Sequence, residues 1–321
     1  MVSRGRDIPR APLARRKTGL LTRFGADRAP GARARAVFVG VSLAPIMAIF
    51  IAFSTLPIIG VIAFSFFRYS FVLPDHSFRG LTYFNNLFAD PLFWTGLKST
   101  LIFMALALPL NILLSLPAAL GLQHVLRFRG FLRTCYFLPT VVSTVAVSLL
   151  GLALFDPSTG LANAFLSAVH LPIGHWLSDP ITATPVIVVL AVWQDLGYNI
   201  ILFLAGLLAI PRDFYEAARI DGAGSMAMLR YITLPLLKRT SSFAIILTMI
   251  GYLQTFTYQK VMANGGPDDS TQVLSLYIYN IGIGTVTPLL SQAMGAAVVL
   301  LAIIMVVTLV QLRLSRVQWD Y

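Results

Sequence analysis

The chain has few charged residues and a single cysteine. Of its 321 residues, 12% are charged and 57% are hydrophobic, and the mean hydropathy is +0.79. A water-soluble domain carries about 25% charged residues, so this composition excludes one. The lone Cys135 excludes a disulfide within one chain, and together with four scattered histidines it offers no metal cluster.

The sequence also lacks a phosphate-binding loop and the residue sets of an intramembrane enzyme. No GxxxxGK[ST] pattern occurs, so the chain has no such loop to bind ATP. No apolar segment pairs a histidine with an acid or a serine at a spacing suited to catalysis. We therefore expect a chain that is not an enzyme, without catalytic residues, a metal or a bound cofactor of its own.

Long apolar segments are what the chain has instead. A helix needs about 20 apolar residues to cross the roughly 30 Å of hydrocarbon in a bilayer. We therefore expect an all-α polytopic membrane protein, with six transmembrane helices within residues 37–314 and lipid around them. The six segments cover residues 37–67, 98–123, 131–155, 181–210, 241–263 and 289–312.

Basic residues are concentrated in alternate connections between these segments. Twenty of the 24 Lys and Arg residues lie in residues 1–36, 127–133, 212–239 and 313–316. Because cytoplasmic segments retain positive charge, this pattern predicts an even number of crossings with both termini cytoplasmic, in a bacterial-type plasma membrane. The net charge of +11 does not indicate a nucleic-acid partner, since the basic residues are not interleaved with stacking aromatics.

The two ends of the chain are polar. Residues 1–36 hold ten Lys or Arg residues with scattered Pro and Gly, so we expect a mostly disordered cytoplasmic arm. A signal peptide is the alternative, but the apolar segment that follows is about twice as long as a signal core of 7–15 residues. Residues 315–321 would form a short cytoplasmic tail.

The other connections carry turn signals. Residues 68–97 are expected to hold a short amphipathic helix at the membrane surface, with an aromatic run through Phe93 and Trp94. Turn formers begin the next two loops, at 156–160 and at 264–267.

Residues 211–238, in a connection expected to be cytoplasmic, predict two short helices. Asp213 is expected to cap the first, with Glu216 completing a capping box. Gly222 and Gly224 would end it, and a second helix would cover 226–231 before Pro235 starts the next span.

The small Ala217 and Ala218 leave little side-chain bulk on this segment, so the groove of another protein could approach its backbone. An ordinary helical turn in a loop would explain the same residues, and local physics leaves both readings open.

The spacing of this segment carries a family resemblance. Glu-Ala-Ala, three residues, Gly, nine residues, Ile, one residue and Leu-Pro run from residue 216 to residue 235. This pattern resembles the signature loop of binding-protein-dependent ABC importer permeases, and the resemblance extends over about residues 37–314. It implies an ATPase-coupling role for Glu216, Ala217, Ala218, Asp221, Gly222, Leu234 and Pro235.

Three further stretches look like the carbohydrate-uptake branch, which includes maltose and glycerol-phosphate permeases. They are Phe78-Arg79-Gly80-Leu81, Gly265-Gly266-Pro267 and residues 271–279. The resemblance implies a sugar or polyol substrate, two ATP-binding-cassette ATPase subunits that hold ATP and Mg, and an extracytoplasmic solute-binding protein. It also implies a second permease subunit, expected to be a different chain. The basic arm is not part of this pattern.

Polar residues inside the apolar segments are candidates for a substrate path, because they are costly in lipid and tend to face water or the bundle interior. Hydrogen bonds between helices would explain each of them equally well. The candidates are Trp193, Gln194, Asp195, Tyr198, Asn199, Gln254, Tyr258 and Gln292.

The main alternative function is an ion-coupled secondary transporter. Such carriers use intramembrane carboxylates and commonly have more spans. One acid, Asp195, within the predicted spans and a cytoplasmic docking loop favour the importer permease.

Overall fold

The computed structural model describes residues 32–69, 77–124, 128–285 and 289–314. This part of the chain is helical, and its β structure is limited to one isolated bridge between Phe67 and Phe78. The chain divides into two compact units, with the boundary between Leu56 and Pro57. Most of the predicted basic arm and the whole predicted tail lie outside the described residues.

The first unit holds α1 (Ala32–Phe50) and a π-helical turn, η1 (Ile51–Thr55). A second π-helical turn, η3 (Leu229–Thr233), occurs in the other unit, and both turns are followed by Leu-Pro, at 56–57 and 234–235. Proline lacks an N–H group, and its ring clashes with the carbonyl four residues earlier. A widened turn just before the proline relieves this conflict.

Five helical stretches are long and apolar enough to cross a membrane, and a bent pair of helices would make a sixth crossing. This agrees with the predicted all-α protein of six spans. The five stretches are Val37–Phe64, Pro91–Gln123, Pro180–Leu208, Ser225–Met262 and Leu290–Leu314. Besides α1 and η1, they comprise α2 (Leu56–Phe64), α4 (Pro91–His124), α8 (Pro180–Leu208), α10 (Ser225–Met228), η3, α11 (Leu234–Gln254), α12 (Thr257–Met262) and α14 (Leu290–Leu314).

The third predicted span, 131–155, is not one continuous helix. It consists of α5 (Arg129–Val141) and α6 (Thr144–Phe155), whose axes differ by 93°. Val142 and Ser143 between them have extended ψ angles of 143° and 133°. A carbonyl freed at such a break must find another partner in lipid, and Val142 finds one in the side chain of Gln194.

A short helix is present in residues 68–97, as predicted, but it covers only part of this connection. It is α3 (Thr82–Ala89), and α4 begins directly after it at Pro91. Phe93 and Trp94 therefore belong to the long helix α4 and not to the short helix. Phe93 is fully buried against Leu87 and Tyr277, so tertiary packing extends the membrane helix beyond its predicted start at residue 98.

The predicted turns are present, with additional short helices between them. The Asp156 carboxylate accepts hydrogen bonds from the side chains and N–H groups of Ser158 and Thr159, which lower its pKa to about 2. Asn264 and Gly265 adopt positive φ angles of 48° and 90°. The short helices that the sequence did not predict are α7 (Leu161–Ala168), η2 (Trp176–Ser178) and α13 (Leu274–Gly282).

The centre of the second unit is the contact between α4 and α8. Phe103 and Ala107 of α4 are buried with Ile187 and Ala191 of α8 in one core cluster. Helices in lipid gain stability from close packing rather than from exclusion of water, so small residues at this contact are favourable.

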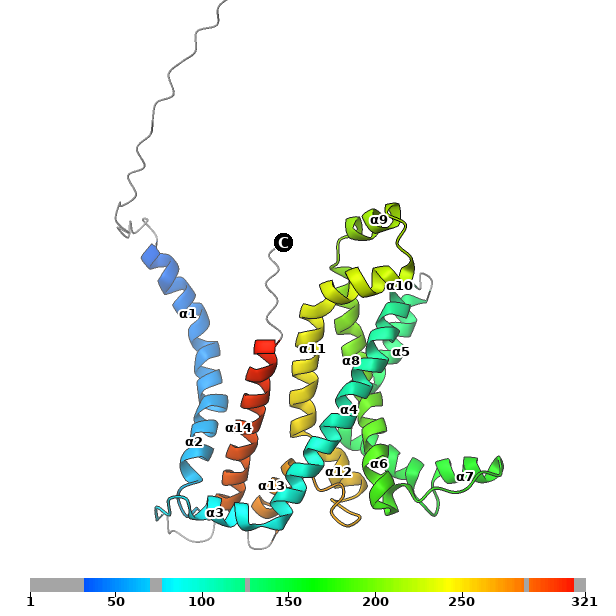
Figure 1. Ribbon diagram of the computed structural model, residues 1–321. Helices are drawn as coiled ribbons and strands as arrows, with labels where there is room; N and C mark the ends of the chain where they lie inside the picture. Colours follow the sequence, from blue (N-terminus) through cyan, green and yellow to red (C-terminus); the bar gives the residue numbers. More distant parts are fainter. Residues whose placement is uncertain (1–31, 70–76, 125–127, 286–288, 315–321) are drawn as a thin grey trace, which may run out of the picture. The chain divides into compact units, whose positions relative to one another are not determined.

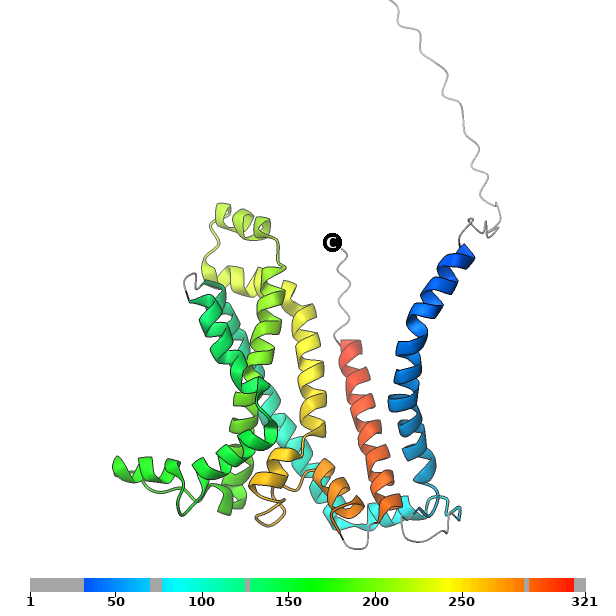
Figure 2. The ribbon, with the colours of Figure 1, turned by 180° about the vertical axis from the view of Figure 1, so that it is seen from behind.

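The second unit has two distinct ends. α9 (Arg212–Ile220) and α10 lie at one end, whereas α3, α7 and α13 lie at the other (Figure 1; seen from behind in Figure 2). The basic residues of 212–239 are thus grouped at the α9 end.

Candidate functional site

The predicted coupling segment begins with α9, but the predicted capping box is absent. Pro211, with φ −59° and ψ 139°, occupies the N-cap position, and no side chain caps the helix. Asp213 therefore lies inside the first turn, where its charge still interacts favourably with the helix dipole. The prediction of an Asp213 cap was wrong because the extended proline starts the helix two residues earlier.

The end of α9 follows the predicted turn at Gly222. This residue has φ +78°, and its N–H donates to the Arg219 carbonyl at 3.1 Å. The N–H of Ala223 donates to the Ala218 carbonyl at 2.8 Å. These two bonds form a Schellman motif, for which a left-handed glycine is the usual residue.

The proposed coupling residues lie on one projecting segment. Those on α9 and its turn are Glu216, Ala217, Asp221 and Gly222, which are exposed, and Ala218, which is half-buried. Leu234 and Pro235 are exposed at the start of α11. The spacing from residue 216 to residue 235 therefore spans a helix, a tight turn and the beginning of a long helix.

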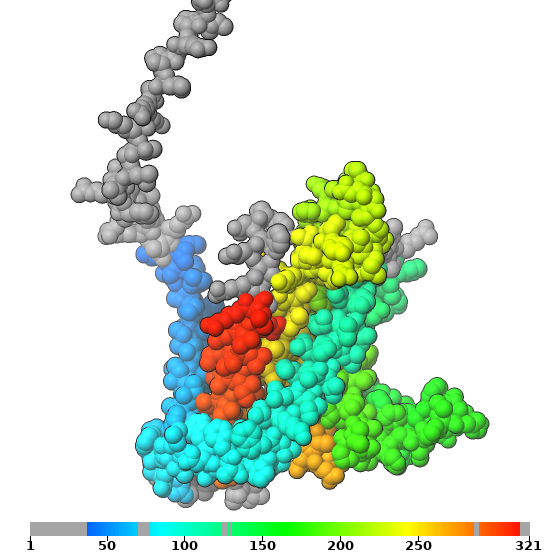
Figure 3. All heavy atoms as spheres, viewed as in Figure 1, coloured from blue at the N-terminus to red at the C-terminus, as the bar shows by residue number. Residues whose placement is uncertain are grey.

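The same segment exposes apolar side chains that the sequence reasoning did not single out. Ile220 is 87% exposed, and Met226, Tyr231 and Phe214 are also exposed. Figure 3 shows α9 and α10 as a projection from the end of the bundle. Exposed apolar residues grouped on a projection are typical of a protein interaction site, and their position beside the motif was the available signal.

One candidate for the substrate path, Asn199, is part of a buried network between helices. It is 1% exposed, and its Nδ2 donates to Asn111 Oδ1 at 2.7 Å and to Thr248 Oγ1 at 2.9 Å. Asn111 Nδ2 donates in turn to the Tyr252 hydroxyl at 3.0 Å. The network joins α4, α8 and α11. Asn111 and Thr248 were missed, although each is a polar residue in an apolar helix.

Gln194 and Tyr258 also bond to each other. The Tyr258 hydroxyl donates to Gln194 Oε1 at 2.6 Å, and Gln194 Nε2 donates to the Val142 carbonyl at 2.8 Å. The Thr140 hydroxyl donates to the Gln194 backbone carbonyl at 2.8 Å. Gln194 thus holds the break between α5 and α6 against α8.

Gln292 lies at the opposite end of the second unit from α9. Its Nε2 donates to the Tyr277 hydroxyl at 3.1 Å, which donates to Asp90 Oδ2 at 2.7 Å. Burial and the neighbouring Asp90 raise the pKa of Tyr277. These contacts fasten α13 and α14 to the start of α4.

Three candidates are exposed. Trp193 and Tyr198 lie on α8, and Gln254 lies at the end of α11 beside a cavity of about 420 Å³. The cavity is mostly apolar, and it includes the stacked rings of Phe256 and Tyr279, whose centroids are 5.5 Å apart. The structure therefore does not bring the eight candidates together in one site.

Asp195 is the remaining candidate, and it is half-buried. Its carboxyl group interacts with the hydroxyl group of Tyr252, a member of the buried network. It shares a helix face with Tyr198, three residues later. Asp195 thus lies where the buried network reaches a partly open face.

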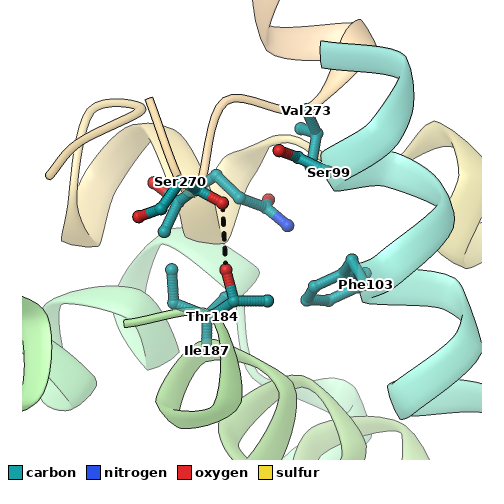
Figure 4. A pocket seen from close by; sticks show the side chains of 8 residues that line it. Ser99, Phe103, Thr184, Ile187, Ser270 and Val273 are labelled. Carbon is teal, nitrogen blue, oxygen red and sulfur yellow. Dashed lines mark hydrogen bonds between the residues drawn. The ribbon is translucent and has the colours of Figure 1, made fainter. Parts of the chain in front are cut away.

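A second pocket lies between α4, α8, α12 and the loop before α13. Ser99, Phe103, Thr184 and Ser270 line it, and the Thr184 hydroxyl donates to the Ser270 carbonyl at 3.1 Å (Figure 4). The pocket has no room for a water-sized molecule. Gln259, which also lines it, is 1% exposed, and neither polar atom of its amide has a hydrogen-bond partner.

Gln259 and Gln194 form a matched pair for a stability test. We expect Gln259→Met to raise the melting temperature of the purified protein in detergent, because an unsatisfied buried amide costs about 1–3 kcal/mol. Gln194→Met should lower it, because the Tyr258 hydroxyl and the Val142 carbonyl lose their partner. A lower melting temperature for Gln259→Met would show that its amide is satisfied.

Within the described residues, no group of three His, Cys, Asp or Glu side chains could hold a metal ion. The candidate functional residues therefore lie in two separate places. One is the projecting helical segment at one end, and the other is a set of polar side chains between the membrane helices. This arrangement offers docking and polar contacts.

Comparison with known proteins agrees with this description. The chain is 36% identical to the lactose transport system permease protein LacF of Rhizobium radiobacter over 280 residues, which cover 85% of this chain and 92% of the relative. It is 33% identical to the trehalose/maltose transport system permease protein MalF of Thermococcus litoralis over 281 residues, covering 86% and 92%.

A solved structure has the same fold. A chain in the crystal structure of a bacterial alginate ABC transporter, in complex with an alginate pentasaccharide-bound periplasmic protein, matches with a TM-score of 0.78 and 26% identity. The match covers 90% of this chain and 98% of that one. The family described as binding-protein-dependent transport system inner membrane component matches residues 111–317, which include the whole coupling segment. The resemblance drawn from the spacing is thereby confirmed, and the chain belongs to this family of multi-pass transport components.

Proposed function

We propose that this chain is the membrane-spanning permease subunit of an ABC importer that carries a sugar, a polyol or a sugar derivative. The relatives named for lactose and for trehalose/maltose, and the alginate transporter structure, support this substrate class. A solute-binding protein would deliver the substrate from outside, as the family's description implies. Family membership favours this role over an ion-coupled secondary transporter.

The observation that carries the proposal is the exposed coupling segment. A helix with small residues and exposed apolar side chains projects from the bundle, and the sequence has no phosphate-binding loop. We infer that two ATPase subunits, which bind ATP and Mg, dock on this segment and on that of a second, different permease subunit. In that arrangement the chain needs no ATPase site or cofactor of its own.

The proposal places the α9 end on the cytoplasmic side. The basic residues of 212–239 support this orientation under the positive-inside rule. With six crossings, both termini would be cytoplasmic, and the loops near α3, α7 and α13 would face the solute-binding protein.

For the substrate path we favour the face of α8 that carries Asp195 and Tyr198. A sugar ring presents hydroxyl groups and apolar CH faces, which suit a carboxylate beside an aromatic ring. Asn199, Gln194, Tyr258 and Gln292 already bond within the chain, so we assign them to helix packing. Trp193, two residues before Asp195, lies on another face of the helix.

We expect Asp195→Ala to lower the uptake rate about tenfold or more, because a hydrogen bond to a charged group contributes about 1.5–3 kcal/mol. Asp195→Asn should lose less, since it keeps a polar group in place. Trp193→Phe is the control on the other face and should transport normally. The uptake rate is measured with radiolabelled sugar in proteoliposomes. A normal rate for Asp195→Ala would show that Asp195 is not part of the substrate path.

The function itself is tested by reconstitution. The chain is co-purified with its associated proteins, inserted into liposomes and supplied with ATP and candidate solute-binding proteins. ATP-dependent, vanadate-sensitive sugar uptake supports the proposal. Uptake by the chain alone, driven by an ion gradient, would support the secondary transporter instead.

A further inference from the structure

Among the described residues, a pair of hydroxyl groups joins the coupling helix α9 to η3. The Tyr215 hydroxyl on α9 and Thr233 Oγ1 at the end of η3 are 3.0 Å apart, and they are 18 residues apart in sequence. Tyr215 is half-buried, and Thr233 is 5% exposed. The pair therefore lies beneath the exposed surface of the projection.

The surrounding bonds favour one direction for this contact. Thr233 Oγ1 also lies 3.3 Å from the Met228 carbonyl, to which it donates. A threonine hydroxyl has a single hydrogen. With that hydrogen directed at Met228, Tyr215 is the donor and Thr233 the acceptor, and all three groups are satisfied.

Apart from this bond, α9 makes no extensive contact with another helix in the described part of the chain. Its covalent connections are short turns: Ala209 to Pro211 before it, and Asp221 to Gly224 after it. The second turn contains Gly222 and Gly224, and a Cβ atom on either would meet nothing within 4 Å. Such a turn alone could bend when α9 is displaced.

The acceptor Thr233 lies at the start of a long helical path. The π-helical turn η3 continues directly into α11 at Leu234. α11 carries Thr248 and Tyr252, which belong to the buried polar network with α4 and α8. A displacement of Thr233 would therefore be passed along a continuous helix into the membrane core.

We propose that Tyr215 is a positioning residue that braces α9 against η3, so that movement of α9 is transmitted to α11 and is not absorbed by the turn at Gly222. The proposal rests on the proposed function, in which a partner ATPase moves α9. Tyr215 and Thr233 act here through the coupling segment and touch neither the nucleotide nor the solute.

The test compares four variants in the reconstituted full complex. Tyr215→Phe and Thr233→Val remove one hydroxyl each with little change in shape, the double variant removes both, and Thr233→Ser keeps the acceptor. The measured quantity is the amount of solute transported per ATP hydrolysed, together with the melting temperature and the amount of bound ATPase.

We expect each single removal to lower this ratio several-fold while ATP hydrolysis and assembly persist. The double variant should be no worse than Thr233→Val, because Thr233→Val already lacks the bond that Tyr215→Phe removes. Thr233→Ser should behave like the unmodified protein. An unchanged ratio in the single variants, or losses that multiply in the double variant, would overturn the brace. Absence of ATP-driven uptake in the unmodified complex would instead contradict the proposed function.

Discussion

Gly222→Pro is expected to abolish ATP-driven uptake while the protein still inserts in the membrane. Gly222 has φ +78° and donates its N–H to the Arg219 carbonyl. Proline fixes φ near about −65° and has no N–H, so it cannot form this turn. The end of α9 would be reorganised, and the exposed residues around it would no longer fit a partner.

The matched control is Gly224→Ala. Gly224 has φ −74° and no atom within 4 Å of a new Cβ, so alanine should fit there. Glu216→Lys is a second test variant, because it reverses one exposed charge on α9 without changing the backbone. It should also abolish uptake. Protein levels in membranes and sugar uptake are measured together. Normal transport by both Gly222→Pro and Glu216→Lys would exclude the coupling role.

Gly197→Ala is expected to prevent correct folding. A Cβ atom at Gly197 on α8 would lie 2.7 Å from the carbonyl carbon of Tyr136 and 2.8 Å from the Cα of Phe137, and it would also meet the Tyr136 carbonyl oxygen. These are backbone atoms of α5, so the whole helix would have to move. Overpacking of this kind costs about 1–3 kcal/mol or more, and here it also separates the Gln194 side chain from the Val142 carbonyl.

Gly121→Ala on α4 is the control for this change. A Cβ atom there meets nothing within 4 Å, and alanine favours a helix by about 1 kcal/mol over glycine. We expect Gly121→Ala to express at least as well as the unmodified chain, whereas Gly197→Ala gives little folded protein in detergent by size-exclusion chromatography. A monodisperse Gly197→Ala protein with an unchanged melting temperature would contradict the close contact between α5 and α8.

The coupling segment was well described from its sequence because its conformation is set locally. A glycine after a short helix predicted the turn at Gly222, and the Schellman bonds there join residues within five positions. The capping box failed for a local reason too, since the extended Pro211 displaced Asp213 from the N-cap position. The Tyr215 and Thr233 contact was not predicted, because spacing alone does not show which side chains meet across a turn.

The short helices α7, η2 and α13 were missed for a different reason. α13 buries Leu274 and Tyr277 against α4 and α14, and contacts of that kind outweigh weak local preferences in nine residues. The start of α4 was also placed too late, because Trp94 and the buried Phe93 resemble an interfacial segment when read alone.

The sequence by itself determined that lipid surrounds most of the chain, how many spans it has approximately, and where the coupling motif lies. Apolar length, charge distribution and residue spacing are properties of short stretches, so they are visible without a fold. Only the tertiary structure decided where the third span breaks and which polar residues already form hydrogen bonds within the chain. Asn111 and Asn199 are 88 residues apart in sequence and meet only when α4 and α8 pack. A polar residue in lipid must find a partner, but which partner it finds depends on that packing.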